Sequence, residues 1–292
     1  MSAELSKHRA GRLIQDREHP GQFNMAADLA LAKYARIHTE PVLRLYSWTQ
    51  PTLSLGFHQS IADEVLERCA QVGIAVVRRP TGGRAVLHHH ELTYSLSLPL
   101  ENGATNLARS EILKQIGELF LQVASKLGLN AELVRAGERR NHQIGENTQR
   151  SPFCYDSLSR YEVQLGGCKW IGSAQRFFPG VMLQHGSIPL RNSPFDIRSL
   201  VLTRDSLSTQ EVKQSESFPE LRQIGKEALQ VLIPRVFSER WGITWREEGL
   251  SSAEIAAITA FPEEYPLATQ HINDEKILLD KNHPTSAIAE AI

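Results

Sequence analysis

The chain has 292 residues, of which 41% are apolar, 22% charged and 7% aromatic. This composition is sufficient for a packed core and excludes intrinsic disorder, a collagen-like repeat and a disulfide-rich scaffold. Thirty-two basic side chains oppose 33 acidic ones, so the formal net charge is −1. Proteins that bind nucleic acid over a broad surface usually carry a strong positive field. We therefore expect no nucleic-acid partner.

The cysteines are Cys69, Cys154 and Cys168, and no two of them form a Cys-x-x-Cys pair. An odd number of cysteines without zinc-type spacing argues against a disulfide framework and a structural metal, and favours a reducing compartment. The first residues lack the apolar segment of a signal peptide, and no run approaches the roughly 18 apolar residues of a membrane span. The sequence thus predicts a cytoplasmic protein without a membrane partner.

The first half of the chain predicts one helix and several strands. Residues 25–37 place apolar side chains on one helical face, and Asn24 before them is a candidate N-cap. Residues 41–55 and 73–79 contain β-type runs bounded by prolines, which predict strands. In residues 92–98 apolar and hydroxyl-bearing side chains alternate, and this is the pattern of a strand with one face in the core.

The second half predicts helices around one hairpin. Residues 110–127 have apolar side chains at helical spacing and end before Gly128, a residue type common after a helix. Residues 161–165 alternate again and lead into a Gly-Gly turn, from which residues 168–175 return antiparallel. Three further segments have clear patterns: a strand at 181–190, a helix at 219–241 that ends at Gly242, and a short helix at 252–261.

The order of these segments predicts the fold class. Because the strands mostly precede the helices and do not alternate with them, we expect an α+β protein with a mixed or antiparallel sheet flanked by helices. Residues 1–250 are expected to form one main domain, with the functional motifs between residues 24 and 190. The weakly patterned residues 251–292 are expected to form a helical or loose C-terminal appendage.

One connection between two predicted strands carries a rigid proline, two glycines and several arginines: residues 78–88 are RRPTGGRAVLH. Glycines let backbone N–H groups approach a ligand closely, and arginines bind phosphate or carboxylate groups. A hairpin turn with solvated arginines would have the same composition. His88 is followed by His89 and His90, but three adjacent strand residues cannot all point at one ion, so we expect no metal site there.

Residues 78–88 resemble the R-R-x-[ST]-G-G-[GR]-A-V-x-H signature of the lipoate-protein ligase and octanoyltransferase superfamily. Other landmarks of this superfamily follow in the expected order between residues 24 and 190. They are Asn24-Met25-Ala26 with Asp28; Leu43, Tyr46 and Trp48; Pro51, Ser54, Leu55 and Gly56; Lys169 with Gly172-Ser173-Ala174-Gln175; and His185-Gly186-Ser187-Ile188. The resemblance implies the catalytic domain that this superfamily shares in outline with biotin-protein ligases.

The branch of the superfamily follows from Cys154. Residues 154–163 (CYDSLSRYEV) resemble the C-[FY]-x-x-P-S-x-Y-E-[VL] motif of LipM-type octanoyltransferases, with Leu158 in place of the proline. The LipB-type branch has its cysteine just before the His-Gly strand, where residues 178–182 contain none. ATP-dependent ligases lack the nucleophile and usually carry an accessory domain, for which the residues after Leu190 are few. The resemblance therefore favours the LipM type.

This resemblance implies transfer of octanoyl from octanoyl-acyl carrier protein to a lysine of a lipoyl domain. Acyl transfer from a thioester to an amine is downhill, so no ATP and no cofactor is needed, and a thiolate can divide the transfer into two steps. Cys154 would be the nucleophile, and Lys169 the cation that favours its thiolate and contacts the acyl carbonyl. Expected acceptors are lipoyl-domain proteins such as the glycine-cleavage H protein or the E2 subunits of 2-oxoacid dehydrogenases.

The remaining candidate residues belong to the two glycine-containing motifs and the His-Gly strand. By resemblance, the substrate-binding residues are Arg78, Arg79, Thr81, Gly82, Gly83, Arg84, Ala85, His88, Gly172, Ser173, Ala174, Gln175, His185 and Gly186. His185 is expected to form or orient a wall of the pocket. Cys69 is expected in the core of a helix, and Cys168 on the strand face opposite Lys169.

Three other functions are open at this point. An amidotransferase that moves octanoyl or lipoyl between lipoylated proteins would use similar machinery with a protein amide as donor. An ATP-dependent lipoate-protein ligase would hold an acyl-adenylate with Arg78, Arg79 and the glycine turn, and would not need Cys154. A catalytically silent carrier-protein binder would keep the fold without the chemistry. Leu158, and His89 where the superfamily often has Asp, are the departures compatible with that last function.

Overall fold

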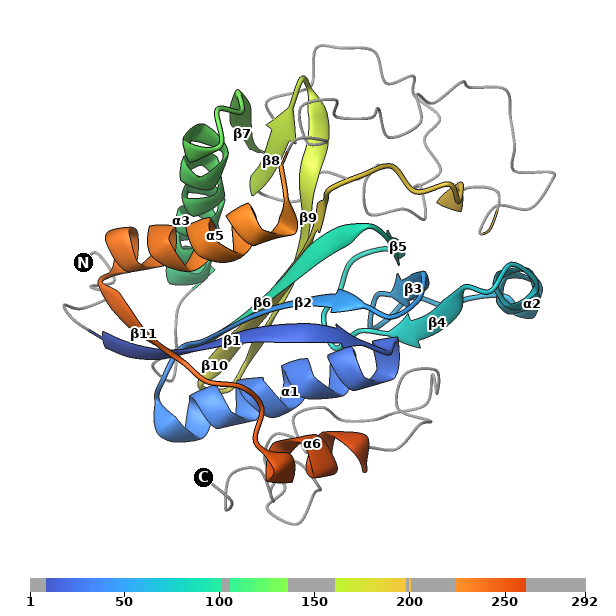
Figure 1. Cartoon of the computed structure of the whole chain (residues 1–292), viewed down its shortest axis with the longest axis horizontal. Helices are drawn as coiled ribbons and strands as arrows, with labels where there is room; N and C mark the ends of the chain where they lie inside the picture. The colour runs from blue at the N-terminus through green and yellow to red at the C-terminus, as the bar shows by residue number, and fades with distance from the viewer. Residues whose placement is uncertain (1–8, 101–105, 136–160, 198–199, 201–223, 261–292) are drawn as a thin grey trace.

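The computed structural model describes residues 9–100, 106–135, 161–197, 200 and 224–260. Within them, an eight-stranded sheet crosses the molecule (Figure 1). Its strands, in spatial order, are β11 (Ile243–Glu247), β1 (Arg9–His19), β2 (Val42–Trp48), β6 (Glu91–Pro99), β10 (Val181–Pro189), β9 (Cys168–Phe178), β8 (Tyr161–Leu165) and β7 (Ala131–Arg135). β1 runs parallel to both neighbours, and the other pairs are antiparallel, so the sheet is mixed.

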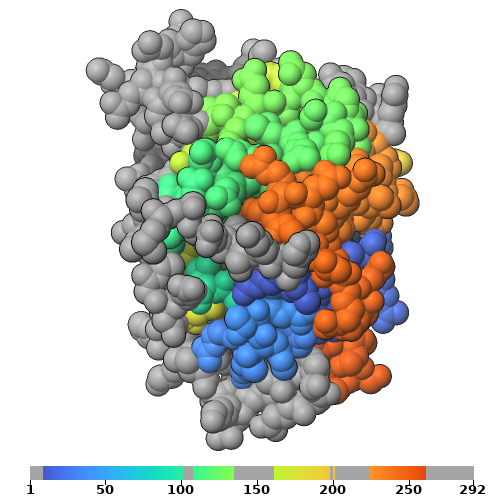
Figure 2. Space-filling model, turned by 90° about the vertical axis from the view of Figure 1, so that its left-hand side faces the viewer, coloured from blue at the N-terminus to red at the C-terminus, as the bar shows by residue number. Residues whose placement is uncertain are grey.

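Helices cover both faces of this sheet. α1 (Gly21–His38) lies on one face with α6 (Ser252–Thr259) against it, and α3 (Asn106–Lys126) and α5 (Lys226–Trp241) lie on the other (Figure 1). Figure 2 shows α3 and α5 side by side over that second face. The largest hydrophobic cluster fills the space between α3, α5 and the sheet, and a second cluster lies beneath α1. The sheet is therefore covered on both sides.

A smaller sheet of β4 (Ala75–Arg78), β3 (Thr52–Leu55) and β5 (Val86–His88) lies beside one end of the large sheet (Figure 1). α2 (Asp63–Gln71) packs on it through Val65 and Cys69, which are both buried with Leu53 and Leu55. The predicted glycine turn connects β4 to β5. This arrangement brings the turn close to the large sheet, because Phe57 N donates to Thr81 O and Arg176 of β9 donates to Pro80 O.

The predicted α+β class with a mixed sheet flanked by helices is confirmed. The predicted helices and strands are present within a few residues of their expected ends. Gly128 and Gly242 both have the positive φ expected after a helix, at 73° and 64°. α5 begins at Lys226, and residues 219–223 lie outside the described residues. None of the described helices is long and apolar enough to span a bilayer.

Two predictions from the sequence are wrong. Asn24 is not the N-cap of α1, because the helix begins at Gly21 after Pro20; the Asn24 amide is buried and donates to the carbonyls of His19 and Ser47. β6 is buried on both faces rather than one. Its hydroxyl-bearing residues face α1 and are buried there, and Thr93 is paired with Glu91.

Candidate active site

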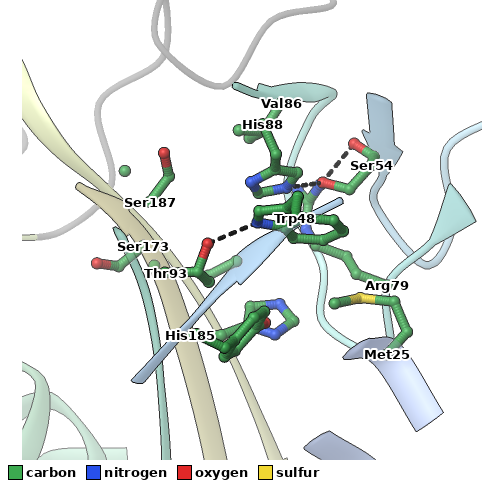
Figure 3. A pocket seen from close by; sticks show the side chains of 14 residues that line it. Met25, Trp48, Ser54, Arg79, Val86, His88, Thr93, Ser173, His185 and Ser187 are labelled. Carbon is green, nitrogen blue, oxygen red and sulfur yellow. Dashed lines mark hydrogen bonds between the residues drawn. The ribbon is translucent and has the colours of Figure 1, made fainter. Parts of the chain in front are cut away.

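A pocket lies between the two sheets. It encloses ≈ 340 Å³, its mouth included, and its walls come from α1, β2, the small sheet, β6, β9 and β10. In Figure 3, Ser173 and Ser187 of the large sheet lie on one side, and Ser54 and Arg79 of the small sheet on the other. The predicted substrate-binding residues that line it are Arg79, His88, Gly172, Ser173, Ala174, His185 and Gly186.

The floor of the pocket is one row of residues across four strands. Tyr46 of β2 pairs with Thr93 of β6, Thr93 with Ser187 of β10, and Ser187 with Gly172 of β9. Paired residues share a face, and strands lie about 4.8 Å apart, so this row is about 14 Å long. Gly172 at one end has no side chain. The floor of the pocket thus runs across the strands rather than along them.

His185 connects the large sheet to the glycine turn through the first of two buried hydrogen-bond chains. Its Nδ1 lies 2.9 Å from Asp28 Oδ2, and its Nε2 lies 2.6 Å from Thr81 Oγ1. Because Asp28 accepts a hydrogen bond from the Nδ1–H group, Nε2 carries no proton and accepts a hydrogen bond from the Thr81 hydroxyl. Burial lowers the pKa of His185, although the hydrogen bond to Asp28 opposes this shift. The imidazole is therefore neutral and orients the turn.

His88 belongs to the second chain. Its Nδ1 lies 2.8 Å from Glu91 Oε1 and its Nε2 lies 2.7 Å from Ser54 Oγ, and the ring stacks on Trp48. A hydroxyl, an imidazole and a carboxylate in this order also occur in hydrolases. Here the chain lies beside Trp48, at the end of the pocket away from Lys169. Its hydrogen bonds hold the wall together.

The polar side chains that line the pocket are all hydrogen-bonded to other protein groups. Arg79, for example, donates to Ser54 O and Oγ, and Tyr46 donates to Asp28. Trp48 donates to Thr93, and Ser187 donates to Glu91. A ligand in this pocket consequently meets mainly carbon atoms and satisfied polar groups. Such a surface suits an apolar chain, since burial of an unpaired polar group would be costly.

Arg79 determines the shape of the glycine turn. Its guanidinium donates to Gly82 O at 2.8 Å and to Arg84 O at 2.7 Å, and the side chain is buried. Gly83 has a φ of 92°, in the left-handed region that favours glycine. The predicted Thr81 is buried and reaches His185. Arg79 also lines the pocket, so the turn is fixed against the pocket wall by buried hydrogen bonds, with Gly83 exposed at its tip.

Replacement of Gly56 by alanine should distort this turn. An added Cβ would lie 1.9 Å from Gly83 O and 2.8 Å from Gly83 C, and these backbone atoms cannot move as a flexible side chain can. We expect a loss of about 1–3 kcal/mol in unfolding free energy, measured by urea denaturation. Gly249→Ala is the matched control, because open space surrounds that position. Equal stability of the two variants would contradict the expected overlap.

Lys169 lies on the pocket face of β9. It pairs across the strands with Gln164, whereas Val163 and Ile171 face α3, so Lys169 and Gly172 share the opposite face. Its side chain is 5% exposed, and Nζ donates to Glu162 Oε1 at 2.7 Å. The ion pair with Glu162 orients the Lys169 ammonium, which carries three N–H donors. Lys169 lies near the first residue of β9, three residues before Gly172.

The other predicted residues have different places. Arg78 donates to the carbonyls of Gly56, Phe57 and Gln59, and so holds that loop. Ala85 is buried in the core of the small sheet, and the backbone carbonyl of Arg84 accepts a hydrogen bond from Arg79. The side chains of Ser173 and Gln175 face α3, where they line a separate cavity. Only the backbone of Ser173 therefore lines the pocket between the two sheets. Cys154 lies outside the described residues.

The other two cysteines lie away from the pocket. Cys69 is buried in α2, and burial raises the pKa of its thiol. Cys168 pairs with Leu165 on the α3 face of the sheet, opposite Lys169. Of the three adjacent histidines only His88 lines the pocket, while His89 Nδ1 lies near Ser193 Oγ. Within the described ranges, no three His, Cys, Asp or Glu side chains gather as a metal site.

Glu91 is the main residue of this site that the sequence did not suggest. It accepts hydrogen bonds from His88, Thr93 and Ser187, which come from three strands. The available signal was a carboxylate at the start of an otherwise uncharged buried strand, three residues after His88. Glu162 was known only as part of the Cys154 motif, and its pairing with Lys169 depends on the hairpin register.

The lowered pKa of His185 predicts a pH effect on stability. The folded state resists protonation, so the unfolded state binds more protons once the pH falls below the unfolded value of about 6.5. His185 therefore makes its full contribution to the unfolding free energy above pH 6.5, and this contribution is lost as the pH falls from there toward the lower pKa of the folded state. Urea denaturation at pH 7.5 and pH 5.5 should show this loss. His185→Gln should reduce the difference, and the exposed His58→Gln should not.

Comparison with known proteins agrees with this geometry. The profile of the lipoyl protein ligase A/B catalytic domain matches residues 20–229, more than half of the chain. Octanoyltransferase LipM of Clostridioides difficile is 36% identical over 191 residues, which are 65% of this chain and 68% of that protein. Octanoyltransferase LipM of Kyrpidia tusciae is 40% identical over 63% of this chain and 67% of that protein. The chain therefore belongs to the lipoyl protein ligase A/B catalytic domain family.

Solved structures support the same fold. A bipartite lipoate protein ligase from Thermoplasma acidophilum superposes with a TM-score of 0.66 at 21% identity, over 88% of this chain and 96% of that chain. Lipoate-protein ligase A bound with ATP superposes with a TM-score of 0.59 at 23% identity, over 85% of this chain and 92% of that chain. At these identities the likeness concerns the fold alone.

Proposed function

We propose that this protein is an octanoyltransferase that moves octanoyl from acyl carrier protein to a lysine of a lipoyl domain through an acyl-enzyme on Cys154. The observation that carries the proposal is the pocket between the two sheets, whose polar groups are satisfied and whose floor ends at Gly172, on the same strand face as Lys169. Relatives named octanoyltransferase LipM, 36–40% identical, support the same acyl group. The cytoplasm is the expected compartment.

The dimensions of the pocket favour a medium-length acyl chain. Seven C–C bonds of about 1.5 Å in a zigzag span about 9 Å, so an extended octanoyl group fits along the 14 Å row estimated from strand spacing. Burial of its six methylenes would contribute up to about 5 kcal/mol. With the carbonyl at Gly172 beside Lys169, the chain would cross β10 and β6 and end near Trp48.

In the first chemical step, the Cys154 thiolate attacks the thioester carbonyl, the bond to the carrier's sulfur breaks, and that sulfur takes up the proton that Cys154 released on ionising. In the second step, the lysine amine of the acceptor attacks the acyl-enzyme, an amide forms, the bond between the Cys154 sulfur and the acyl carbon breaks, and the proton from the amine restores the Cys154 thiol. Cys154 precedes Tyr161 by seven residues, a length that spans at most about 25 Å. Within that reach, Lys169 can stabilise the oxyanion and the thiolate.

Replacement of Lys169 by methionine should slow octanoyl transfer. Loss of one oxyanion donor typically costs about 10²–10³-fold in kcat, and we expect that range in a single-turnover assay. The change also leaves Glu162 buried beside an apolar side chain. The double variant Lys169→Met/Glu162→Gln also removes the carboxylate charge and should stay equally slow. The surface variant Lys114→Met, on α3, should behave as wild type; slow transfer in that variant, or fast transfer in the first two, would contradict the assigned role.

The experiment that tests the function is intact mass spectrometry of the wild-type protein after incubation with octanoyl-acyl carrier protein without ATP. The expected result is an octanoyl adduct that disappears when a lipoyl domain is added, with octanoyl appearing on the lipoyl domain. An adduct formed only from an octanoylated H protein would instead identify an amidotransferase. Transfer that requires ATP and free octanoate would identify a ligase. The absence of any adduct or transfer would contradict all three.

A further inference from the structure

The far end of the pocket, opposite Gly172, is closed by a small hydrophobic cluster. Met25 of α1, Tyr46 and Trp48 of β2 and Val77 of β4 are buried against one another, separate from the larger cores. Three of them also line the pocket, so the cluster forms its end wall; Met25 and Trp48 are visible in Figure 3. An apolar chain that enters beside Lys169 would meet this wall with its terminal methyl group.

Trp48 is held in this wall by contacts on its edge and on its face. The indole Nε1 donates to Thr93 Oγ1 at 2.7 Å. The ring stacks on His88, with centroids 4.1 Å apart and planes 15° from parallel. These contacts fix the position and the tilt of the indole. Loss of the Thr93 hydroxyl or of the His88 ring would therefore alter the length of the pocket.

Both partners of Trp48 are held by the same carboxylate. Glu91 Oε1 accepts from Thr93 at 2.5 Å and from His88 Nδ1 at 2.8 Å, and Oε2 accepts from Ser187 on the pocket floor. The Glu91 side chain is 2% exposed. Because a carboxylate only accepts, it sets the direction of all three hydrogen bonds, and the Thr93 hydroxyl is left to accept from Trp48.

We propose that Glu91 is a positioning residue that fixes Trp48 as the end wall and thereby sets the acyl chain length that the pocket accepts. This inference rests on the proposed acyltransferase function, because it assigns the acyl chain to this pocket. Glu91 itself does not touch the acyl group in this arrangement. It acts through Thr93 and His88, whose positions determine where the indole stops the chain.

The order of affinities for free fatty acids tests this proposal without catalysis. In an open groove each added methylene strengthens binding about fourfold. Against a fixed wall, affinity should rise from hexanoate to octanoate and then fall by at least about tenfold at decanoate. Titration calorimetry of the whole protein with these three acids should give that peaked order. In Glu91→Gln, Thr93 and His88 lose their shared carboxylate acceptor and no longer fix the indole, so decanoate should bind within about threefold of octanoate.

Three further variants separate positioning from a general loss of stability. Thr93→Val removes the Trp48 acceptor but no charge, and should relax the order as Glu91→Gln does. Thr93→Ser keeps the hydroxyl and should therefore keep the affinity peak at octanoate. Glu254→Gln is the matched control, because Glu254 of α6 is equally buried but pairs with Arg12 of β1. It should keep the peak even if it lowers the melting temperature.

A peak at octanoate that persists in both Glu91→Gln and Thr93→Val would overturn the inference and leave the proposed function intact. The same holds if Glu254→Gln relaxes the order as much as Glu91→Gln does. If Glu91→Gln does not fold, Thr93→Val and Thr93→Ser decide the matter. If wild type binds none of the acids and forms no octanoyl adduct, the proposed function fails, and the inference fails with it.

Discussion

Replacement of Cys154 by alanine should lower octanoyl transfer by at least about a thousandfold and abolish the octanoyl adduct. Loss of the nucleophile in a covalent mechanism removes the intermediate, and only binding and electrostatic stabilisation remain. The pocket and Lys169 would still bring the thioester and the acceptor amine together, so a slow direct transfer is expected to persist. The measurement is single-turnover transfer to a lipoyl domain, combined with intact mass spectrometry.

The other cysteines provide controls for this prediction. Cys69→Ala should retain the adduct, because that thiol is buried in α2 and its pKa is raised by burial. Cys168→Ala should also retain it, since this residue lies on the sheet face opposite Lys169. An adduct that moves with Cys168, or a Cys154→Ala variant that transfers at the wild-type rate, would exclude the proposed acyl-enzyme.

Segments with one strong local pattern were predictable from the sequence. The alternation of β6, the 3.6-residue period of α3 and the Gly-Gly hairpin between β8 and β9 all correspond to described elements. β1 and β11 were missed because their patterns are weak. β1 carries a buried Arg12 that pairs with Glu254, a residue 242 positions away. A charge whose partner is so remote looks like a surface residue in any sequence window.

In the candidate site, too, the residues with a local motif were predictable and those that depend on remote partners were not. The family motifs indicated Arg79, His88, Gly172 and His185, and these residues do meet in one pocket. Glu91 had no motif of its own, because its role arises only when three strands bring their donors to one carboxylate. The motif also grouped Ser173 with Ala174, although adjacent strand residues face opposite sides of the sheet. Sequence locates the site, and register decides which side chains enter it.

The second large effect is expected from Arg44→Met. Arg44 has no exposed surface; its guanidinium donates to Asp16 Oδ2 at 2.8 Å and to Asp28 Oδ1 at 3.2 Å. Burial alone would raise the pKa of Asp16, but Arg44 and His19 together lower it. Removal of one partner from such a buried network leaves uncompensated carboxylates and costs about 3–5 kcal/mol. We expect the thermal midpoint to fall by about 10 °C.

A double-mutant cycle tests whether the loss arises from the charges. Asp28→Asn in the Arg44→Met background removes one stranded carboxylate, so the double variant should be less destabilised than the sum of the single variants, by about 1–3 kcal/mol. Arg235→Met, which breaks an exposed pair with Glu239 on α5, should leave the midpoint unchanged. Strict additivity in the cycle would mean that lost packing, not lost charge pairing, causes the effect. Because Asp28 also holds His185 and Tyr46, coupling here would show that the charges beneath α1 support the pocket wall.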